Sequence, residues 1–194
     1  MAYLNYDGNI KLANGYQRKY GDNWNSGFLG VGQANQGYDV VGAYQNFDSS
    51  SKKTTTWTIT PVVTSGNGTY VWSGDQVNLQ NASDGSYLGL YEKFREEDNT
   101  YPVASYSKLS TDNVAFGWTV LKYTPDGSNS DPRLSDSDVI YLVATPANNN
   151  KNGSLAGVLD TNGYGSKLGF LYLVSGTRLL NRGPGTGMWQ VTSL

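Results

Sequence analysis

The sequence has no cysteine and no histidine among its 194 residues. Without cysteine, the chain has no disulfide, no thiolate nucleophile and no cysteine metal site. Without histidine, it lacks Ser-His-Asp and Cys-His catalysis as well as histidine zinc sites. These absences exclude most enzyme templates, so we expect no catalysis, no metal and no cofactor.

An excess of charge of one sign is also missing, because 14 basic side chains stand against 16 acidic ones. Such a chain has no strong field that would attract nucleic acid or anionic lipid, so nucleic acid is not an expected partner. The first residues lack the basic region and apolar run of a signal peptide, and no run of about 20 apolar residues predicts a membrane helix. We expect no membrane insertion, and a protein that is cytoplasmic or released without a signal peptide, which leaves extracellular action open.

Glycine and tyrosine are abundant, with 24 and 15 copies. Short apolar or alternating runs recur between turns rich in Gly, Asn, Asp and Ser, a pattern typical of β-strands. No segment keeps a helical period. The sequence therefore predicts an all-β protein, and we expect a single domain over residues 1–194.

Internal repeats organise the whole chain. Each of three units contains an aliphatic opening residue, an apolar segment with glycine in third place and a Trp-x-aliphatic element. In that order, these elements are Leu4, Val71 and Leu134; Phe28–Val31, Tyr87–Leu90 and Leu155–Val158; and Trp57, Trp118 and Trp189. We predict twelve strands in three four-stranded repeats with pseudo-threefold symmetry, approximately residues 1–66, 67–130 and 131–194.

This ordered repeat resembles the β-trefoil superfamily over essentially the whole chain. The resemblance implies a barrel into which the repeated aliphatic and tryptophan side chains point. The residues expected to face inward are Ile10, Val77, Ile140, Leu12, Leu79, Leu142, Leu29, Leu88, Ala156, Trp57, Trp118 and Trp189. Trp118 is therefore interpreted as a core residue and not as a binding platform. A β-sandwich is the alternative fold.

Among β-trefoil proteins, the chain resembles the ricin-B-like and the fungal or bacterial lectins, because it lacks both a basic heparin-type patch and cysteines. The Gln-x-Trp motif of ricin-B-like repeats is absent, since Thr55, Phe116 and Gly187 replace the glutamines. The sugar ligands of that family therefore do not transfer to this chain, and another family of β-trefoil lectins is favoured. We expect a non-catalytic carbohydrate-binding protein with up to three shallow sites for glycans or glycoproteins, in which a homodimer would add avidity.

The candidate ligand-binding residues are aromatic and polar side chains in the predicted loops. An aromatic ring stacks on the C–H face of a sugar, while carboxylate and amide groups hydrogen-bond its hydroxyls. The candidates of the three units are Tyr20, Asp22, Asn23, Trp24 and Asn25; Asp84, Tyr91, Asn99 and Tyr101; and Asn152, Asp160 and Tyr164. Trp24 is the strongest candidate, because the other units have no counterpart. The alternative is that Trp24 and Tyr20 fold over the barrel's end.

A protein-binding module is the alternative function, either a β-trefoil protease inhibitor or the targeting subunit of a toxin complex. An inhibitor would present one long exposed loop, and residues 124–138 or 92–101 fit that description. Arg133 would be the basic anchor of the first of these loops. A structural repeat domain without a ligand is a third hypothesis.

Overall fold

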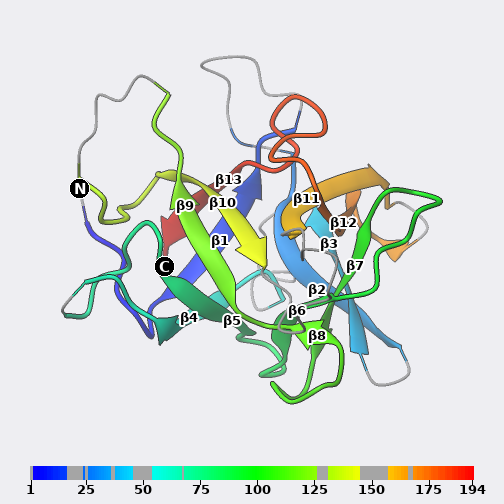
Figure 1. The fold of residues 1–194 in the computed structure, drawn as a ribbon, viewed down its shortest axis with the longest axis horizontal. Helices are drawn as coiled ribbons and strands as arrows, with labels where there is room; N and C mark the ends of the chain where they lie inside the picture. The colour runs from blue at the N-terminus through cyan, green and yellow to red at the C-terminus, as the bar shows by residue number, and fades with distance from the viewer. Residues whose placement is uncertain are drawn as a thin grey trace, which may run out of the picture.

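The computed structural model describes residues 2–16, 24, 26–35, 38–45, 54–66, 68–125, 131–144, 157–165 and 168–194, with only the backbone described for 33–35. Thirteen β-strands and no α-helix lie in these ranges (Figure 1). The strands are β1 (Asn9–Asn14), β2 (Phe28–Asn35), β3 (Tyr38–Tyr44), β4 (Trp57–Val63), β5 (Gln76–Asn81), β6 (Tyr87–Tyr91), β7 (Tyr101–Tyr106), β8 (Val114–Ala115), β9 (Trp118–Lys122), β10 (Val139–Ala144), β11 (Gly157–Tyr164), β12 (Tyr172–Thr177) and β13 (Trp189–Ser193). Across the described ranges, no helix is long and apolar enough to span a membrane.

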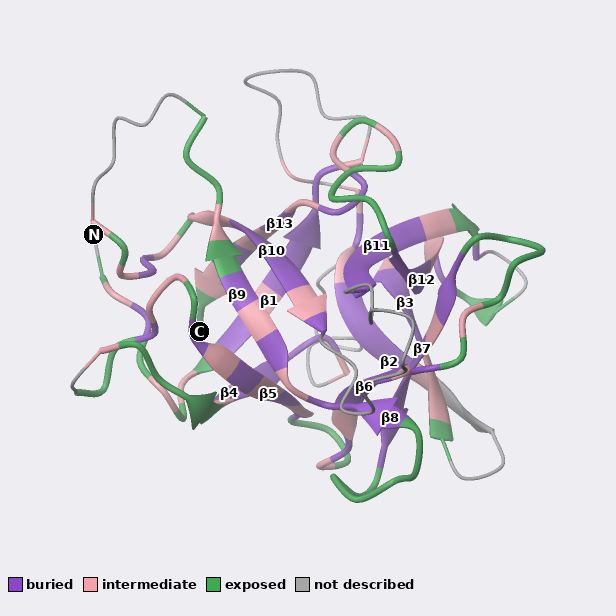
Figure 2. Ribbon diagram, in the orientation of Figure 1, coloured by how far each residue is buried: buried purple, intermediate pink, exposed green. Residues whose placement is uncertain are grey.

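The strands form because apolar and polar residues alternate with the two-residue period of a pleated sheet. In β5, Val77 and Leu79 are buried while the residues beside them are partly exposed. β9 repeats this pattern with Trp118 and Val120. Buried residues predominate along the strands, and exposed residues gather in the connecting loops (Figure 2).

All thirteen strands belong to one hydrogen-bonded sheet, which closes into an antiparallel barrel of ten strands with three extra strands. Figure 1 shows β1, β4, β5, β9, β10 and β13 on the left, and the hairpins β2–β3, β6–β7 and β11–β12 with β8 on the right. β13 pairs with both β1 and β10, while β3, β7 and β12 pair with one another. Hairpins that lie far apart in sequence are thus joined edge to edge.

The prediction of a β-trefoil with twelve strands in three four-stranded repeats is therefore wrong. The closed ten-stranded barrel overturns it, and β8 is a thirteenth strand, paired with β6, that the repeat pattern did not contain. The physical reason is that the sequence repeat specifies which side chains face the core. How the hairpins pair depends on backbone groups, which leave no periodic pattern in the side chains.

The core positions predicted from the repeat are confirmed. All of the predicted inward-facing residues are buried, apart from Ala156, which lies outside the described residues. Trp118 is fully buried, so its interpretation as a core residue holds.

Each of the three core tryptophans also makes the same hydrogen bond. Its indole Nε1 donates to a backbone carbonyl in a hairpin strand or beside one. The pairs are Trp57 with Leu29 at 2.9 Å, Trp118 with Leu88 at 3.0 Å and Trp189 with Leu159 at 3.0 Å. These bonds tie the strand that carries each tryptophan to its neighbouring hairpin.

The indole bonds correct the sequence alignment of the third unit. The repeat pattern aligned Leu155–Val158 with the glycine segments of the first two units, but the carbonyl that accepts from the third indole belongs to Leu159. Leu159 is therefore the counterpart of Leu88 in the second unit. As a result, Asp160 stands where the second unit has Gly89.

We expect Trp118→Ala to lower the free energy of unfolding by roughly 3–5 kcal/mol, because it leaves a large cavity in the core. Urea unfolding followed by circular dichroism measures this loss. Leu121→Ala is the control on the same strand: Leu121 is 37% exposed, and its loss is expected to cost less than about 1 kcal/mol. Equal losses in the two variants would contradict the core role of Trp118.

Candidate functional site

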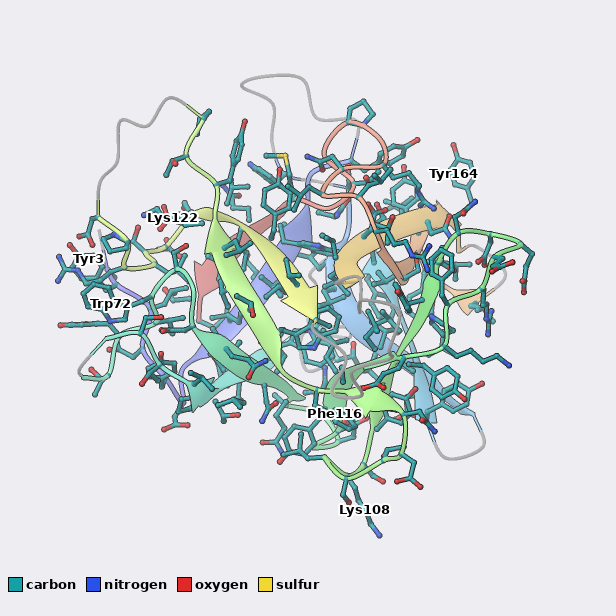
Figure 3. All side chains as sticks on the ribbon, viewed as in Figure 1. Tyr3, Trp72, Lys108, Phe116, Lys122 and Tyr164 are labelled. Atoms are coloured by element: carbon teal, nitrogen blue, oxygen red, sulfur yellow. The ribbon has the colours of Figure 1, made fainter. Side chains whose placement is uncertain are left out.

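A hollow of about 190 Å³ opens between the end of β11, the start of β12, the residues after β1 and the loop of residues 178–188. We call it the tyrosine hollow. Its lining residues are Tyr16, Thr161, Gly163, Tyr164, Tyr172, Arg182, Gly183 and Thr186. Figure 3 shows Tyr164 at the outer margin of the molecule, where its ring is open to a ligand.

Three tyrosine rings surround one side of this hollow. Tyr164 stacks on Tyr172 with ring centroids 5.7 Å apart and planes at 29°, and Tyr16 meets Tyr172 edge-on at 5.1 Å. Tyr164 is 77% exposed, an unusual state for a large aromatic side chain. Burial, together with the two neighbouring tyrosines, raises the pKa of Tyr172, so its hydroxyl is neutral at neutral pH.

A charged pair lies beside the tyrosines. The carboxylate of Asp160 accepts a hydrogen bond from the hydroxyl of Thr186 at 2.8 Å and pairs with the guanidinium of Arg182 at 3.3 Å. Arg182 also donates to the carbonyl of Thr161 at 2.8 Å. The side chain of Arg182 is 30% exposed, whereas that of Asp160 is 0% exposed. The guanidinium of Arg182 therefore faces the hollow, and the carboxylate of Asp160 is buried beneath it.

Burial raises the pKa of Asp160 to about 6, even though Thr186 and Arg182 favour the ionised form. The loss of water around the carboxylate outweighs these two favourable contacts. Asp160 is therefore ionised and paired with Arg182 at pH 7.5, and it gains a proton in mildly acidic solution.

One buried amide holds the walls of the tyrosine hollow together. Asn14 donates to the carbonyls of Thr186 at 2.9 Å and Met188 at 3.3 Å. Its Oδ1 accepts from the backbone N–H of Tyr16 at 2.9 Å and from the hydroxyl of Thr161 at 3.2 Å. Asn14 thus connects the end of β1, β11 and the loop that carries Arg182.

Asn81 of the second unit makes similar hydrogen bonds. Its amide donates to the carbonyl of Thr54 at 2.8 Å, and its Oδ1 accepts from the N–H of Ser83 at 3.0 Å. Asn81 does not line the tyrosine hollow and therefore serves as a comparison for Asn14.

Apolar side chains fill the space in the second unit that the charged pair occupies in the third. A Cβ on Gly89 would lie 2.5 Å from a methyl group of Val114, so the position has no room for a side chain. Val114 stands four residues before its tryptophan, and the corresponding residue of the third unit is Gly185. The third unit therefore has no side chain at the position that Val114 fills in the second unit.

A second hollow, of about 430 Å³, lies over β6, β7 and β8 and is lined in part by Tyr38, Tyr91 and Tyr106. Tyr91 is the only candidate of the second unit that lines it. The rings of Tyr38 and Tyr106 lie 6.2 Å apart. This hollow is larger and contains no buried ion pair like that of Asp160.

The other candidates of the second unit lie elsewhere. Asp84 accepts from the N–H of Ser86 at 2.8 Å and from its hydroxyl at 2.6 Å, within one turn. Asn99 lies exposed in a turn, with a φ of 54°. Tyr101 is buried in the core, where its ring packs edge-on against Phe94 at 4.9 Å. The structure does not bring these residues together with Tyr91 into one site.

Most candidates of the first unit cannot be placed. Trp24 lies against Gly15, where a Cβ would come within 2.6 Å of the indole ring. Gly15 lines a third hollow, of about 320 Å³, together with Tyr123 and Met188. The candidates that lie outside the described residues are Tyr20, Asp22, Asn23, Asn25 and Asn152.

The tyrosine hollow contains residues that the sequence did not suggest. Tyr164 was predicted as a ligand-binding residue and lines the hollow, whereas Asp160 lies beneath it and supports Arg182. Tyr172 and Arg182 were not predicted, whereas Tyr16 belongs to the loop of residues 14–27 that carries the candidates of the first unit. The leucine–tryptophan separation of 30 residues in both the second and the third unit could have revealed Asp160 in a glycine position.

No protein-family model matches the chain, and no curated protein matches its sequence. The solved structures with a similar fold include an SDF2-like protein, a salivary protein and a protein O-mannosyltransferase complex. An SDF2-like protein from Arabidopsis thaliana has a TM-score of 0.69 at 14% identity, over 98% of this chain and 95% of that chain. A Culex salivary protein of the Cysteine and Tryptophan-Rich family has a TM-score of 0.57 at 14% identity, over 100% of this chain and 99% of that one.

The third structure is a protein O-mannosyltransferase complex from S. cerevisiae bound to its sugar donor. The TM-score is 0.62 at 18% identity, over 98% of this chain but only 25% of that chain. At such identities the likeness concerns the fold alone. The neighbours are of SDF2-like and salivary type, so the resemblance to ricin-B-like and other β-trefoil lectins inferred from the sequence is also wrong.

We expect the stability of the wild type to depend on pH through Asp160. Its folded-state pKa of about 6 exceeds the usual value of 3.8, so its contribution is fully present below about pH 4 and is lost as the pH rises through 6. Relative to Asp160→Asn, the free energy of unfolding should fall by roughly 2–3 kcal/mol from pH 4 to pH 7.5. Urea unfolding at several pH values measures this, and a constant difference between the two proteins would contradict it.

Asn14→Ala and Asn81→Ala should each lower the free energy of unfolding by about 1–3 kcal/mol, because each removes the several hydrogen bonds that a buried side-chain amide makes to the backbone. Only Asn14→Ala should loosen the tyrosine hollow. Amide hydrogen exchange at Thr186 and Met188, whose N–H groups donate within the loop of residues 178–188, should accelerate in that variant alone. Equal protection in both variants would show that Asn14 does not hold the loop.

Proposed function

We propose that this chain is a non-catalytic carbohydrate-binding protein that takes a saccharide in the tyrosine hollow. The observation that carries this proposal is the exposed stack of Tyr164 on Tyr172 beside the guanidinium of Arg182. A pyranose has an apolar C–H face that packs on an aromatic ring, and hydroxyls that accept hydrogen bonds. Tyr164 offers the ring, and Arg182 with the tyrosine hydroxyls offers donors.

The dimensions of the hollow favour a short saccharide. A volume of about 190 Å³ is smaller than the roughly 300–1,000 Å³ of ordinary small-molecule pockets, so it favours one sugar ring over an extended chain. A single open site of this kind typically binds in the millimolar range, near −4 kcal/mol. The partner would therefore be a terminal sugar of a glycan or glycoprotein, and nucleic acid is not a proposed ligand.

The absence of catalysis is part of the proposal. Most glycoside hydrolases place two carboxyl groups on either side of the scissile bond. The described residues that line the tyrosine hollow include no aspartate or glutamate, and the buried carboxylate of Asp160 beside them is engaged by Arg182 and Thr186. The described lining therefore offers no pair of facing carboxyl groups.

One structural neighbour agrees with this proposal. The yeast complex is a protein O-mannosyltransferase bound to a sugar donor. A fold similar to that of this chain therefore occurs in a complex that binds a sugar donor. The proposed site depends only on the residues of this chain.

The inhibitor hypothesis finds less support. The guanidinium of Arg133, its expected anchor, pairs with Asp131 at 2.7 Å, donates to the hydroxyl of Tyr3 at 2.7 Å and lies 3.9 Å from the centre of that ring. An anchor for a protease pocket would need to extend into solvent. Figure 3 labels Tyr3 at the margin opposite Tyr164, so this cluster is remote from the tyrosine hollow.

We expect Tyr164→Ala to weaken saccharide binding by about tenfold, because it removes the exposed stacking ring. The melting temperature should remain almost unchanged, since Tyr164 is 77% exposed. A glycan array identifies the ligand, and titration calorimetry measures the affinity. Tyr70→Ala is the matched control, because Tyr70 is also exposed but lies beside Tyr3. Absence of saccharide binding by the wild type, or an equal loss in both variants, would refute the proposed site.

A further inference from the structure

The polar groups of the tyrosine hollow are unequally divided between donors and acceptors. Among the residues that the structure describes, its lining contains one cation, Arg182, and no acidic side chain. A site for a neutral hexose commonly offers a carboxylate that accepts hydrogen bonds from sugar hydroxyls. The sequence suggested Asp160 for that role, but its side chain is 0% exposed and lies under Arg182.

Both oxygens of Asp160 are also engaged. Oδ1 faces the guanidinium of Arg182, and Oδ2 accepts from the hydroxyl of Thr186. The carboxylate therefore positions Arg182 and is not available to a ligand. One guanidinium nitrogen is fixed by Asp160 and Thr161, while 30% of the side chain remains exposed at the hollow.

The position of Arg182 contributes more to the attraction of an anionic ligand than the overall charge of the chain does. The formal net charge of the chain is −2, so its general field would repel an anion. Attraction of an acidic ligand must then come from a local cation. A guanidinium held in place by its own hydrogen bonds loses little entropy when it pairs with a carboxylate or sulfate, and such charge-assisted bonds are stronger than neutral ones.

We infer that the saccharide bound in the tyrosine hollow is acidic: its ring packs on Tyr164, and its carboxylate or sulfate group pairs with Arg182. This inference rests on the proposed function. It narrows the ligand from carbohydrates in general to sugars that carry an anionic group. Arg182 is then the residue that determines specificity, and Asp160 is a positioning residue that holds it.

The test compares three glycosides that differ only at the exocyclic carbon C6: methyl glucoside, methyl glucuronide and methyl glucoside 6-sulfate. Titration at pH 7.5 and low salt should give at least about tenfold tighter binding of one or both acidic forms than of the neutral form. The two acidic arms distinguish a carboxylate from a sulfate. Higher salt should reduce this preference.

The main variant is the double substitution Asp160→Asn with Arg182→Gln, which removes both charges together and leaves no unpaired buried carboxylate. Its preference for acidic over neutral glycosides should fall below about twofold. Arg178→Gln is the matched control. Arg178 belongs to the same loop, but its guanidinium lies over the ring of Phe94 at 3.6 Å, so its removal should leave the preference unchanged. Thermal melting shows whether each variant is folded.

The outcomes separate the inference from the proposed function. If the wild type binds all three glycosides equally, the inference is overturned and the carbohydrate proposal stands. If the preference survives in the folded double variant, Arg182 is not the partner of the anionic group, and the inference is likewise overturned. If the wild type binds none of them and no glycan on an array that includes neutral, uronic and sulfated sugars, the proposed function fails and the inference fails with it.

Discussion

The hydrogen bond from each buried indole to a hairpin carbonyl is the constraint on which the rest of the structure depends. A buried Nε1 requires an acceptor, so each of the three core tryptophans fixes one hairpin against the strand that carries it. In the third unit the acceptor is Leu159, and the next residue is Asp160. The hydrogen bond that fixes Leu159 in the core therefore also fixes the position of the neighbouring carboxylate of Asp160, which supports Arg182.

The tyrosine hollow arises where the core repeat changes from apolar to polar. The second unit fills the space before its tryptophan with Val114, Ala115 and Phe116, whereas the third unit has Gly185, Thr186 and Gly187. A buried carboxylate in this space is tolerated only because a cation and a hydroxyl satisfy it. The replacement of these apolar residues in the third unit weakens the apolar core locally. It also creates a charged, rigid wall beside the exposed tyrosines.

The sequence predicted the core well because its repeat places aliphatic residues and tryptophans at regular intervals, and Ile10, Leu79 and Trp118 are all buried as expected. It predicted the barrel poorly, since the pairing of β3, β7 and β12 depends on backbone groups that are common to all residues. Tyr164 could be suggested from its residue type alone. Arg182 could not, because its place beside Asp160 results from a loop that closes over 22 residues of chain.

Under the proposed function, the asymmetry between the units would also limit how many ligands one chain holds. The position of Asp160 is glycine in the other two units, Gly30 and Gly89, so the arginine–carboxylate arrangement belongs to the third unit alone. A chain with one such site would then cover a terminal sugar without bridging two glycans. An isolated chain would therefore mask a glycosylated surface without clumping it, and cross-linking of cells would begin only when two chains are joined.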